Sequence, residues 1–214
     1  MVKNYGIPVA SEGWPFIFPL AIVTTLLFAV GWKTVGFASL LLTLFVLFFF
    51  RDPERPVPQG KRVVVSPADG RVIVVKDIFE PYYLKKDVKQ ISIFLSVFNV
   101  HVNRTPYGGT VEAVKYNPGR FHIASVDKAS LDNEQTAMVI VNGKDKVLVK
   151  QIAGLIARRI ICYAKPGDTL KTGERFGLIR FGSRVDIFLP SDAELKVKVG
   201  DRIKGARDVI GVLK

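Results

Sequence analysis

Residues 14–32 read WPFIFPLAIVTTLLFAVGW and residues 35–50 read VGFASLLLTLFVLFFF, and neither run contains a charged side chain. At a rise of about 1.5 Å per residue, a helix over the first run is roughly 28 Å long and a helix over the second is roughly 24 Å long. A bilayer core is about 30 Å thick, so the first run is long enough to span it and the second barely is. We therefore expect residues 1–50 to form an apolar α-helical hairpin that anchors the chain in a membrane.

A cleaved secretory signal is a poorer interpretation, because the apolar sequence resumes after only Lys33 and Thr34 and is not followed by a small-residue cleavage site. If both helices cross, the residues before and after the hairpin lie on one side of the membrane. The alternative is a wedge that dips into one leaflet. The basic residues that follow the hairpin place that side in the cytoplasm by the positive-inside tendency; they are Arg51, Arg55, Lys61 and Arg62.

The charge of the chain is also unevenly distributed. The 214 residues contain 31 Lys and Arg against 19 Asp and Glu, yet the only charged residues before Arg51 are Lys3, Glu12 and Lys33. The positive excess therefore belongs to the part after the hairpin. Beside an apolar anchor, it favours an anionic lipid surface as the partner. Nucleic acid is the rival partner for a basic domain, and we expect none here.

Residues 51–60 contain three prolines among charged residues, which indicates an extended linker. Residues 61–214 then consist of short β-branched runs divided by Gly, Pro and Asp turns, which predicts a mainly β domain. At most one helical turn is expected, near residues 153–158. The runs that predict strands are 62–66, 71–78, 90–95, 109–116, 137–141, 146–152, 160–164, 175–179, 185–189 and 194–199.

A weak repeat of Gly-Asp turns supports this fold class. Gly167-Asp168-Thr-Leu-Lys is echoed by Gly200-Asp201-Arg-Ile-Lys, and Ser66-Pro-Ala-Asp-Gly70 precedes a strand in a similar way. Such turns resemble those of the barrel-sandwich hybrid fold of biotinyl and lipoyl carrier domains. No lysine stands in a carrier-type setting between those turns, so the architecture is expected without the swinging arm.

Few residues are available for acid–base or nucleophilic chemistry. The only histidines are His101, at the end of an apolar run, and His122; each has an alternative interpretation as a structural residue. Ser183 follows Gly182 but lacks the Gly-x-Ser-x-Gly elbow of α/β-hydrolases, so the pair alone predicts only a turn. The single cysteine, Cys162, lies in an apolar run and is expected in the core.

Taken in order, these pieces are more specific. The segments that carry the pattern are Ser66-Pro-Ala-Asp69-Gly70, His101 before Arg104-Thr-Pro106, Pro118-Gly119, Asn133-Glu134, Gln151-Ile-Ala-Gly154 with Arg158-Arg159, and Phe181-Gly182-Ser183-Arg184. Their order and spacing resemble the short prokaryotic form of the phosphatidylserine decarboxylase family, over about residues 51–190. The N-terminal apolar anchor fits this family as well.

The resemblance implies an enzyme that makes its own cofactor. Ser183 would attack the preceding carbonyl and become a pyruvoyl group, which cuts the chain between Gly182 and Ser183 into a β chain (1–182) and an α chain (183–214) that stay associated. The pyruvoyl ketone would form a Schiff base with phosphatidylserine and release CO2 and phosphatidylethanolamine. His101 would act as base and proton donor, with Asp69 holding its imidazole; Asp69 alone is equally a turn residue.

One position departs from the family pattern, because many members carry a second histidine where this chain has Arg104. His101 would then serve both cleavage and decarboxylation, or His122 would take one part. The phosphate and carboxylate of the substrate call for nearby cations, for which Arg104, Arg184 and His122 are the expected residues. The resemblance implies no metal.

Two other functions fit parts of the sequence. A membrane adaptor with a carrier-like β domain would remain one intact chain without catalysis. A membrane serine hydrolase using Ser183, His101 and Asp69 would also remain intact but would react with a serine-directed phosphonate. Assembly into a homo-oligomer is left open by the sequence.

Overall fold

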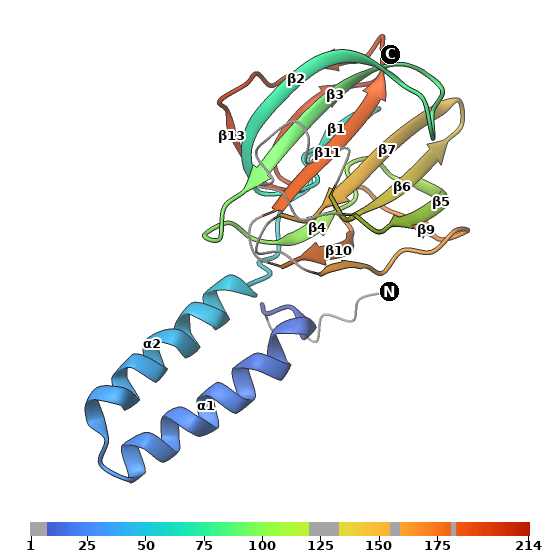
Figure 1. The fold of residues 1–214 in the computed structure, drawn as a ribbon. Helices are drawn as coiled ribbons and strands as arrows, with labels where there is room; N and C mark the ends of the chain where they lie inside the picture. The colour runs from blue at the N-terminus through green and yellow to red at the C-terminus, as the bar shows by residue number, and fades with distance from the viewer. Residues whose placement is uncertain (1–7, 120–132, 155–158, 181–182) are drawn as a thin grey trace. The chain divides into compact units, whose positions relative to one another are not determined.

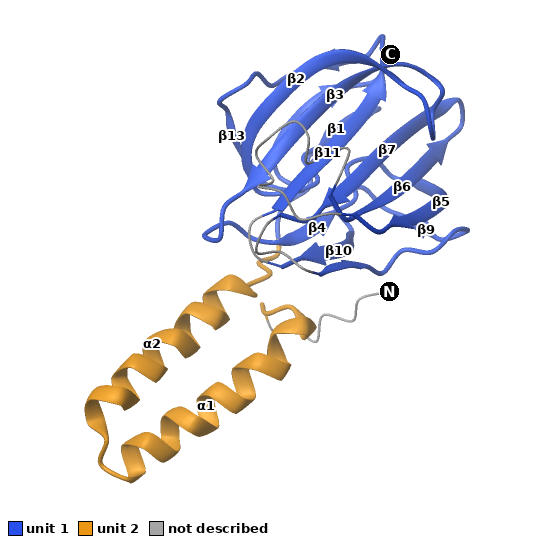
Figure 2. Ribbon diagram, in the orientation of Figure 1, with its two compact units in different colours: residues 1–2, 55–214 blue, residues 3–54 orange. Residues whose placement is uncertain are grey.

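The computed structural model describes residues 8–119, 133–154, 159–180 and 183–214. The chain separates into two compact units, residues 3–54 and residues 55–214 (Figure 2). The first contains both helices and the second contains all the named strands. The two units divide in the proline-rich sequence that follows the last apolar residue of the hairpin. Prolines among charged residues neither continue a helix nor pair in a sheet.

The helical unit is a hairpin. A short 3-10 turn, η1 (Ser11–Gly13), leads into α1 (Trp14–Ala29), and α2 (Lys33–Phe49) returns antiparallel to it (Figure 1). The reversal is made at Gly31, whose φ of +82° lies in the left-handed region that glycine adopts without strain. The continuous helical stretch Ser11–Ala29 is long and apolar enough to cross a membrane, whereas α2 is a shorter apolar helix.

The two helices meet through small and hydroxyl-bearing residues. The Thr24 hydroxyl lies 2.7 Å from that of Ser39 and 3.2 Å from that of Thr43. Gly36 lets the Phe28 ring approach closely, since a Cβ there would lie 3.1 Å from the ring. Many large apolar side chains are instead exposed on the outside of the hairpin, Leu41 among them at 67 %. Small residues inside and bulky apolar residues outside suit a helix pair surrounded by lipid.

The β unit is built from one large curled sheet and two small ones (Figure 1). The eight-stranded sheet has the order β13-β2-β3-β11-β7-β6-β5-β9, and the three-stranded sheets have the orders β1-β14-β12 and β4-β10-β8, with every pair antiparallel. The strands are β1 (Val63–Val65), β2 (Gly70–Glu80), β3 (Lys86–Leu95), β4 (Val102–Arg104), β5 (Gly109–Asn117), β6 (Gln135–Asn142), β7 (Asp145–Ile152), β8 (Ile160–Cys162), β9 (Thr169–Leu170), β10 (Arg175–Ile179), β11 (Ser183–Pro190), β12 (Glu194–Leu195), β13 (Arg202–Ile203) and β14 (Val209–Val212).

Strand β11 is the centre of this arrangement. It lies between β3 and β7, and seven of its eight residues are buried. Side chains alternate along a strand, so Val185, Ile187 and Leu189 face the main apolar core while Phe188 packs in a second, smaller cluster on the other face. The face that carries Phe188 also holds a buried ion pair between Arg184 and Asp186, so β11 is covered on both faces although it contains polar residues.

The prediction of a mainly β domain behind an apolar helical N-terminus is confirmed. The predicted strands appear with shifted ends, except that the run 194–199 forms only the two-residue β12. Four of the described strands were not predicted: β4, β9, β13 and β14. The helical turn expected at residues 153–158 falls partly outside the described residues.

Candidate functional site

Ser183 is the first residue of β11, where it lies opposite Leu95 of β3. The side chain is fully buried, and its Oγ makes no hydrogen bond with the described residues. It projects from the same side of the strand as Val185, toward the main core. Buried hydroxyls are normally hydrogen-bonded, so an unpartnered one at the start of a central strand is a functional candidate. Gly182, the other half of the predicted cleavage pair, lies outside the described residues.

His101 lies directly before β4 and is fully buried. Its Nδ1 is 2.9 Å from the carbonyl oxygen of Asn99, and its own carbonyl accepts a hydrogen bond of 3.3 Å from the backbone N–H of Ile179. Ile179 ends β10, four residues before Ser183. The antiparallel pairing of β4 with β10 therefore places His101 beside the segment that leads into Ser183.

Asp69 has different partners from those expected. Both carboxylate oxygens accept hydrogen bonds from the guanidinium of Arg55, one of them at 2.8 Å, and Oδ1 also accepts from the backbone N–H of Gly205 at 2.8 Å. Each side chain of the ion pair is about nine-tenths buried. Within the described residues, no hydrogen bond joins Asp69 to His101. The carboxylate fastens residues before and after the turn at Ser66–Gly70 instead.

The glycine after Asp69 has a clear packing reason. A Cβ on Gly70 would lie 2.2 Å from the carbonyl oxygen of Phe94 on the neighbouring strand β3. No side chain fits there without moving backbone, so glycine allows β2 to pair closely with β3 from its first residue. In this motif, Asp69 therefore forms an ion pair, and Gly70 allows a close contact with the backbone of β3.

Arg184 belongs to a buried polar network on the other face of β11. Its Nε donates to Asp186 Oδ1 at 2.6 Å and its Nη2 donates to Ser92 Oγ at 2.8 Å. Gln90 completes the group by donating to Ser92 and Asp186, each at 3.0 Å. Because consecutive residues of a strand point to opposite faces, the arginine projects away from the side that carries the Ser183 hydroxyl.

Arg104 is also buried, and its Nη1 contacts the carbonyl oxygen of Gly173 at 3.4 Å. Alternation along β4 puts its side chain on the side opposite Asn103. The strand geometry thus turns Arg184 away from the serine hydroxyl, and Arg104 stays a predicted substrate-binding residue. The third expected substrate-binding residue, His122, lies outside the described residues.

Sequence reasoning missed a pair of buried amides. Gln151 of β7 donates from Nε2 to Asn103 Oδ1 at 2.8 Å and to the carbonyl oxygen of Ile161 at 3.3 Å. The remaining polar atoms of the pair, Asn103 Nδ2 and Gln151 Oε1, are buried and have no hydrogen-bond partner among the residues that the structure describes. Gln151 lies opposite Val185 of β11, two residues from Ser183. Gln151 is one of several polar residues in β7, so the sequence contained no clear signal that its side chain is buried.

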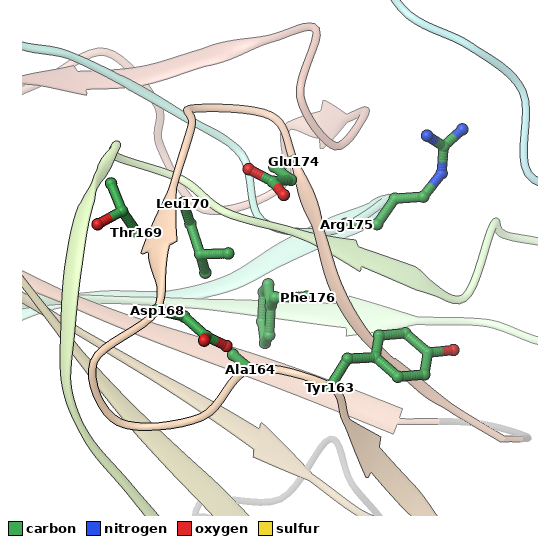
Figure 3. A pocket seen from close by; sticks show the side chains of 8 residues that line it. All are labelled: Tyr163, Ala164, Asp168, Thr169, Leu170, Glu174, Arg175 and Phe176. Carbon is green, nitrogen blue, oxygen red and sulfur yellow. The ribbon is translucent and has the colours of Figure 1, made fainter. Parts of the chain in front are cut away.

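A cavity of about 220 Å³ lies elsewhere in the β unit (Figure 3). Its carboxylates have structural partners, since Asp168 accepts from the backbone N–H of Lys165 and Glu174 accepts from that of Lys171. None of the predicted site residues lines it. The lining residues are Tyr163, Ala164, Asp168, Thr169, Leu170, Glu174, Arg175 and Phe176.

Fold and site together define a β protein with a buried, unpartnered serine at the head of its central strand and an apolar helical hairpin before it. The phosphatidylserine decarboxylase family model matches residues 42–211. The chain belongs to that family.

Three relatives match over their whole length, and each is named phosphatidylserine decarboxylase proenzyme. The protein of Syntrophotalea carbinolica is 48 % identical over 214 residues, covering 100 % of both chains. That of Ralstonia nicotianae is 47 % identical over 215 residues, again covering 100 % of both. That of Geotalea uraniireducens is 45 % identical over 213 residues, covering 99 % of this chain and 100 % of the relative. The resemblance predicted from the sequence is confirmed, and the adaptor and hydrolase alternatives are not favoured.

Proposed function

We propose that the protein is a pyruvoyl-dependent phosphatidylserine decarboxylase, made as a precursor that cuts itself between Gly182 and Ser183. One observation carries the proposal beyond family membership. The Ser183 hydroxyl is fully buried and has no hydrogen-bond partner among the described residues, at the position where the resemblance requires a nucleophile. The naming of the full-length relatives as proenzymes supports a precursor.

In the cleavage step, Ser183 Oγ attacks the carbonyl carbon of Gly182 and loses its proton to a base. The C–N bond between the two residues breaks, the nitrogen takes up a proton, and an ester replaces the amide. Removal of the Ser183 α proton then expels the ester oxygen, which leaves residues 1–182 with a carboxylate and position 183 as dehydroalanine. Water hydrolyses this group to a ketone and ammonia. A buried hydroxyl with no competing hydrogen bond suits the first step.

His101 is the proposed base, because its backbone is hydrogen-bonded to Ile179 in the strand that leads into the cleavage pair. Histidine exchanges protons near neutral pH, which suits both the acceptance of the serine proton and later proton delivery to the substrate. Asp69 remains the proposed carboxylate partner for cleavage. To orient an imidazole it would have to give up a hydrogen bond to Arg55 or Gly205.

The ketone at position 183 would supply an electrophile that binds the amine of the substrate and takes up the electron pair released with CO2. The surrounding chain must then hold the head group, exclude water and return a proton to the α carbon. Full burial of Ser183 and His101 supports water exclusion. His101 is the proposed proton donor.

The two chains are expected to stay together after cleavage. Residues 183–190 lie between β3 and β7 in the middle of the large sheet, and residues 209–212 pair with β1. Separation would therefore expose strand edges and core side chains at the same time, at a high cost in free energy.

The hairpin gives the reaction its location. A diacyl lipid stays in the bilayer, so an anchored enzyme meets it by a two-dimensional search. The exposed apolar surface of α1 and α2 supports insertion, and the basic residues that follow support a catalytic unit on the cytoplasmic face, next to anionic lipid.

Intact mass spectrometry of the purified protein tests this function. The wild type should give two chains ending and beginning at residues 182 and 183, with the smaller one blocked to Edman degradation, and should release CO2 from phosphatidylserine vesicles. Ser183→Ala should remain one inactive chain of 23.8 kDa. Ser191→Ala is the matched control, since that serine is exposed and should not affect cleavage. An active wild type that is a single unbroken chain would overturn the proposal.

A further inference from the structure

The amide pair of Asn103 and Gln151 is unusual because it is buried and only half satisfied. Asn103 is fully buried and Gln151 is 1 % exposed. The Nε2 group of Gln151 donates to both Asn103 Oδ1 and the Ile161 carbonyl, and this fixes which end of each amide is which. In the described part of the chain, one N–H donor group, Asn103 Nδ2, and one acceptor, Gln151 Oε1, are left without partners. Each such atom costs about 1 to 3 kcal/mol when buried.

The fold makes room for this pair. Gly177 of β10 lies against Gln151, and a Cβ there would be 2.7 Å from Gln151 Nε2 and 2.3 Å from the carbonyl oxygen of Ile161. Any other residue at position 177 would push the amide away from Asn103. The absence of a side chain at Gly177 therefore accompanies two unsatisfied polar atoms, a combination that a purely structural core would not need.

The pair also lies close to the proposed reaction centre. Gln151 is directly opposite Val185 of β11, and Ser183 is two residues before Val185 on the same face. Such diagonal neighbours in an antiparallel sheet are roughly 7 to 8 Å apart, which is the span of a small polar head group. Asn103 belongs to β4, which His101 directly precedes, so the amide lies two residues along the chain from the proposed base.

We propose that Asn103 and Gln151 form the subsite for the amino acid head group of the substrate. Asn103 Nδ2 donates to the carboxylate, and Gln151 Oε1 accepts from the amine. This inference rests on the proposed decarboxylase function and names the residues that hold its substrate. It replaces the expectation that Arg104 or Arg184 binds the carboxylate.

A neutral donor suits this reaction better than an arginine. The carboxylate loses its charge as CO2 leaves, so any group that stabilises the charged carboxylate strongly also stabilises the ground state and raises the barrier. A guanidinium would do this through a bidentate ion pair. A carboxamide N–H orients the carboxylate with a weaker interaction.

Asn103→Asp is the decisive variant, because it keeps the Oδ1 atom that accepts from Gln151 and replaces only the unpartnered NH2 by oxygen. The probes are two soluble head groups, glycerophosphoserine and glycerophosphoethanolamine, of which only the first has a carboxylate. Their dissociation constants are measured by calorimetry on the mature wild type and variants in detergent. We expect Asn103→Asp to raise the dissociation constant of glycerophosphoserine by about 10-fold to 100-fold. The dissociation constant of glycerophosphoethanolamine should stay within about 2-fold of the wild-type value. Gln151→Met should raise the dissociation constants of both head groups.

Cleavage is recorded first for every variant by intact mass, which separates this inference from the function beneath it. A wild type that is uncut or inactive defeats the proposed function. An active wild type whose Asn103→Asp variant binds both head groups normally, or loses both equally, overturns the subsite alone. If Asn103→Asp, Asn103→Ser and Asn103→Ala all stay uncut, the amide is needed for folding or cleavage of the precursor rather than for substrate binding. The subsite is then likewise overturned.

Discussion

The guanidinium of Arg55 donates hydrogen bonds to both carboxylate oxygens of Asp69. This ion pair connects the first residues of the β unit to the turn before β2. The Arg55 Nη1 group also donates to the carbonyl oxygen of Gly205 at 2.8 Å. Three segments far apart in the sequence are therefore fastened by one ion pair that is about nine-tenths buried. Loss of one partner leaves a buried charge, whereas loss of both does not.

Asp69→Asn is predicted to lower the free energy of unfolding by about 3 kcal/mol and to accumulate uncut precursor. The stability loss is read from chemical denaturation and the precursor from intact mass. Arg55→Met/Asp69→Leu should recover most of the stability, because apolar side chains replace the pair, and should still remain uncut. Prompt maturation of this double variant would limit Asp69 to a structural role.

Arg184→Met is predicted to destabilise the protein by about 3 kcal/mol or more, because Asp186 would lose a fully buried ionic partner. Ser92→Ala, which removes the hydroxyl that accepts from both Arg184 and Gln90, should cost about 1 to 3 kcal/mol. In the fraction that matures, the KM for phosphatidylserine should be unchanged in both variants. A normally stable Arg184→Met enzyme with a raised KM would instead support the original expectation that this arginine binds substrate.

Cys162 is predicted to react slowly with alkylating reagents. Burial raises the pKa of its thiol to about 11, and a backbone hydrogen bond with Ala164 offsets only part of this rise. The thiolate is the reactive form, so about one molecule in a thousand is reactive at pH 8. The rate of iodoacetamide labelling should rise about tenfold per pH unit between pH 8 and 10. Equally fast labelling of the folded and guanidine-unfolded protein at pH 8 would contradict the raised pKa.

The side of the membrane is testable with one introduced thiol. Tyr82, in the turn between β2 and β3, is 71 % exposed. In a Cys162→Ser background, Tyr82→Cys should resist a membrane-impermeant maleimide in intact cells and react after permeabilisation, because the proposed orientation places this unit in the cytoplasm. Labelling in intact cells would reverse the orientation. Trp32→Cys, at the tip of the hairpin, would be labelled from outside only if both helices cross.

The sequence alone determined the large divisions of this protein and its family. Long uncharged runs can only be buried or in lipid, and short β-branched runs between Gly, Pro and Asp turns form strands, so both fold classes were readable from local pattern. The motif order around Ser183 was sufficient to identify the family. Strand β4 was missed because its buried side includes Asn103, and a polar residue inside breaks the apolar alternation on which strand prediction depends.

Only the tertiary structure decided which of the candidate side chains meet. Asp69 pairs with Arg55 and with the backbone of Gly205, 136 residues away in the chain, and Gln151 meets Asn103 across 48 residues. The formation of a strand from residue 183 onward turns Arg184 to the face opposite Ser183, because consecutive residues of a strand point to opposite faces. Such contacts follow from pairings between distant segments, where a shift of one residue reverses every side chain, and local sequence does not contain that register.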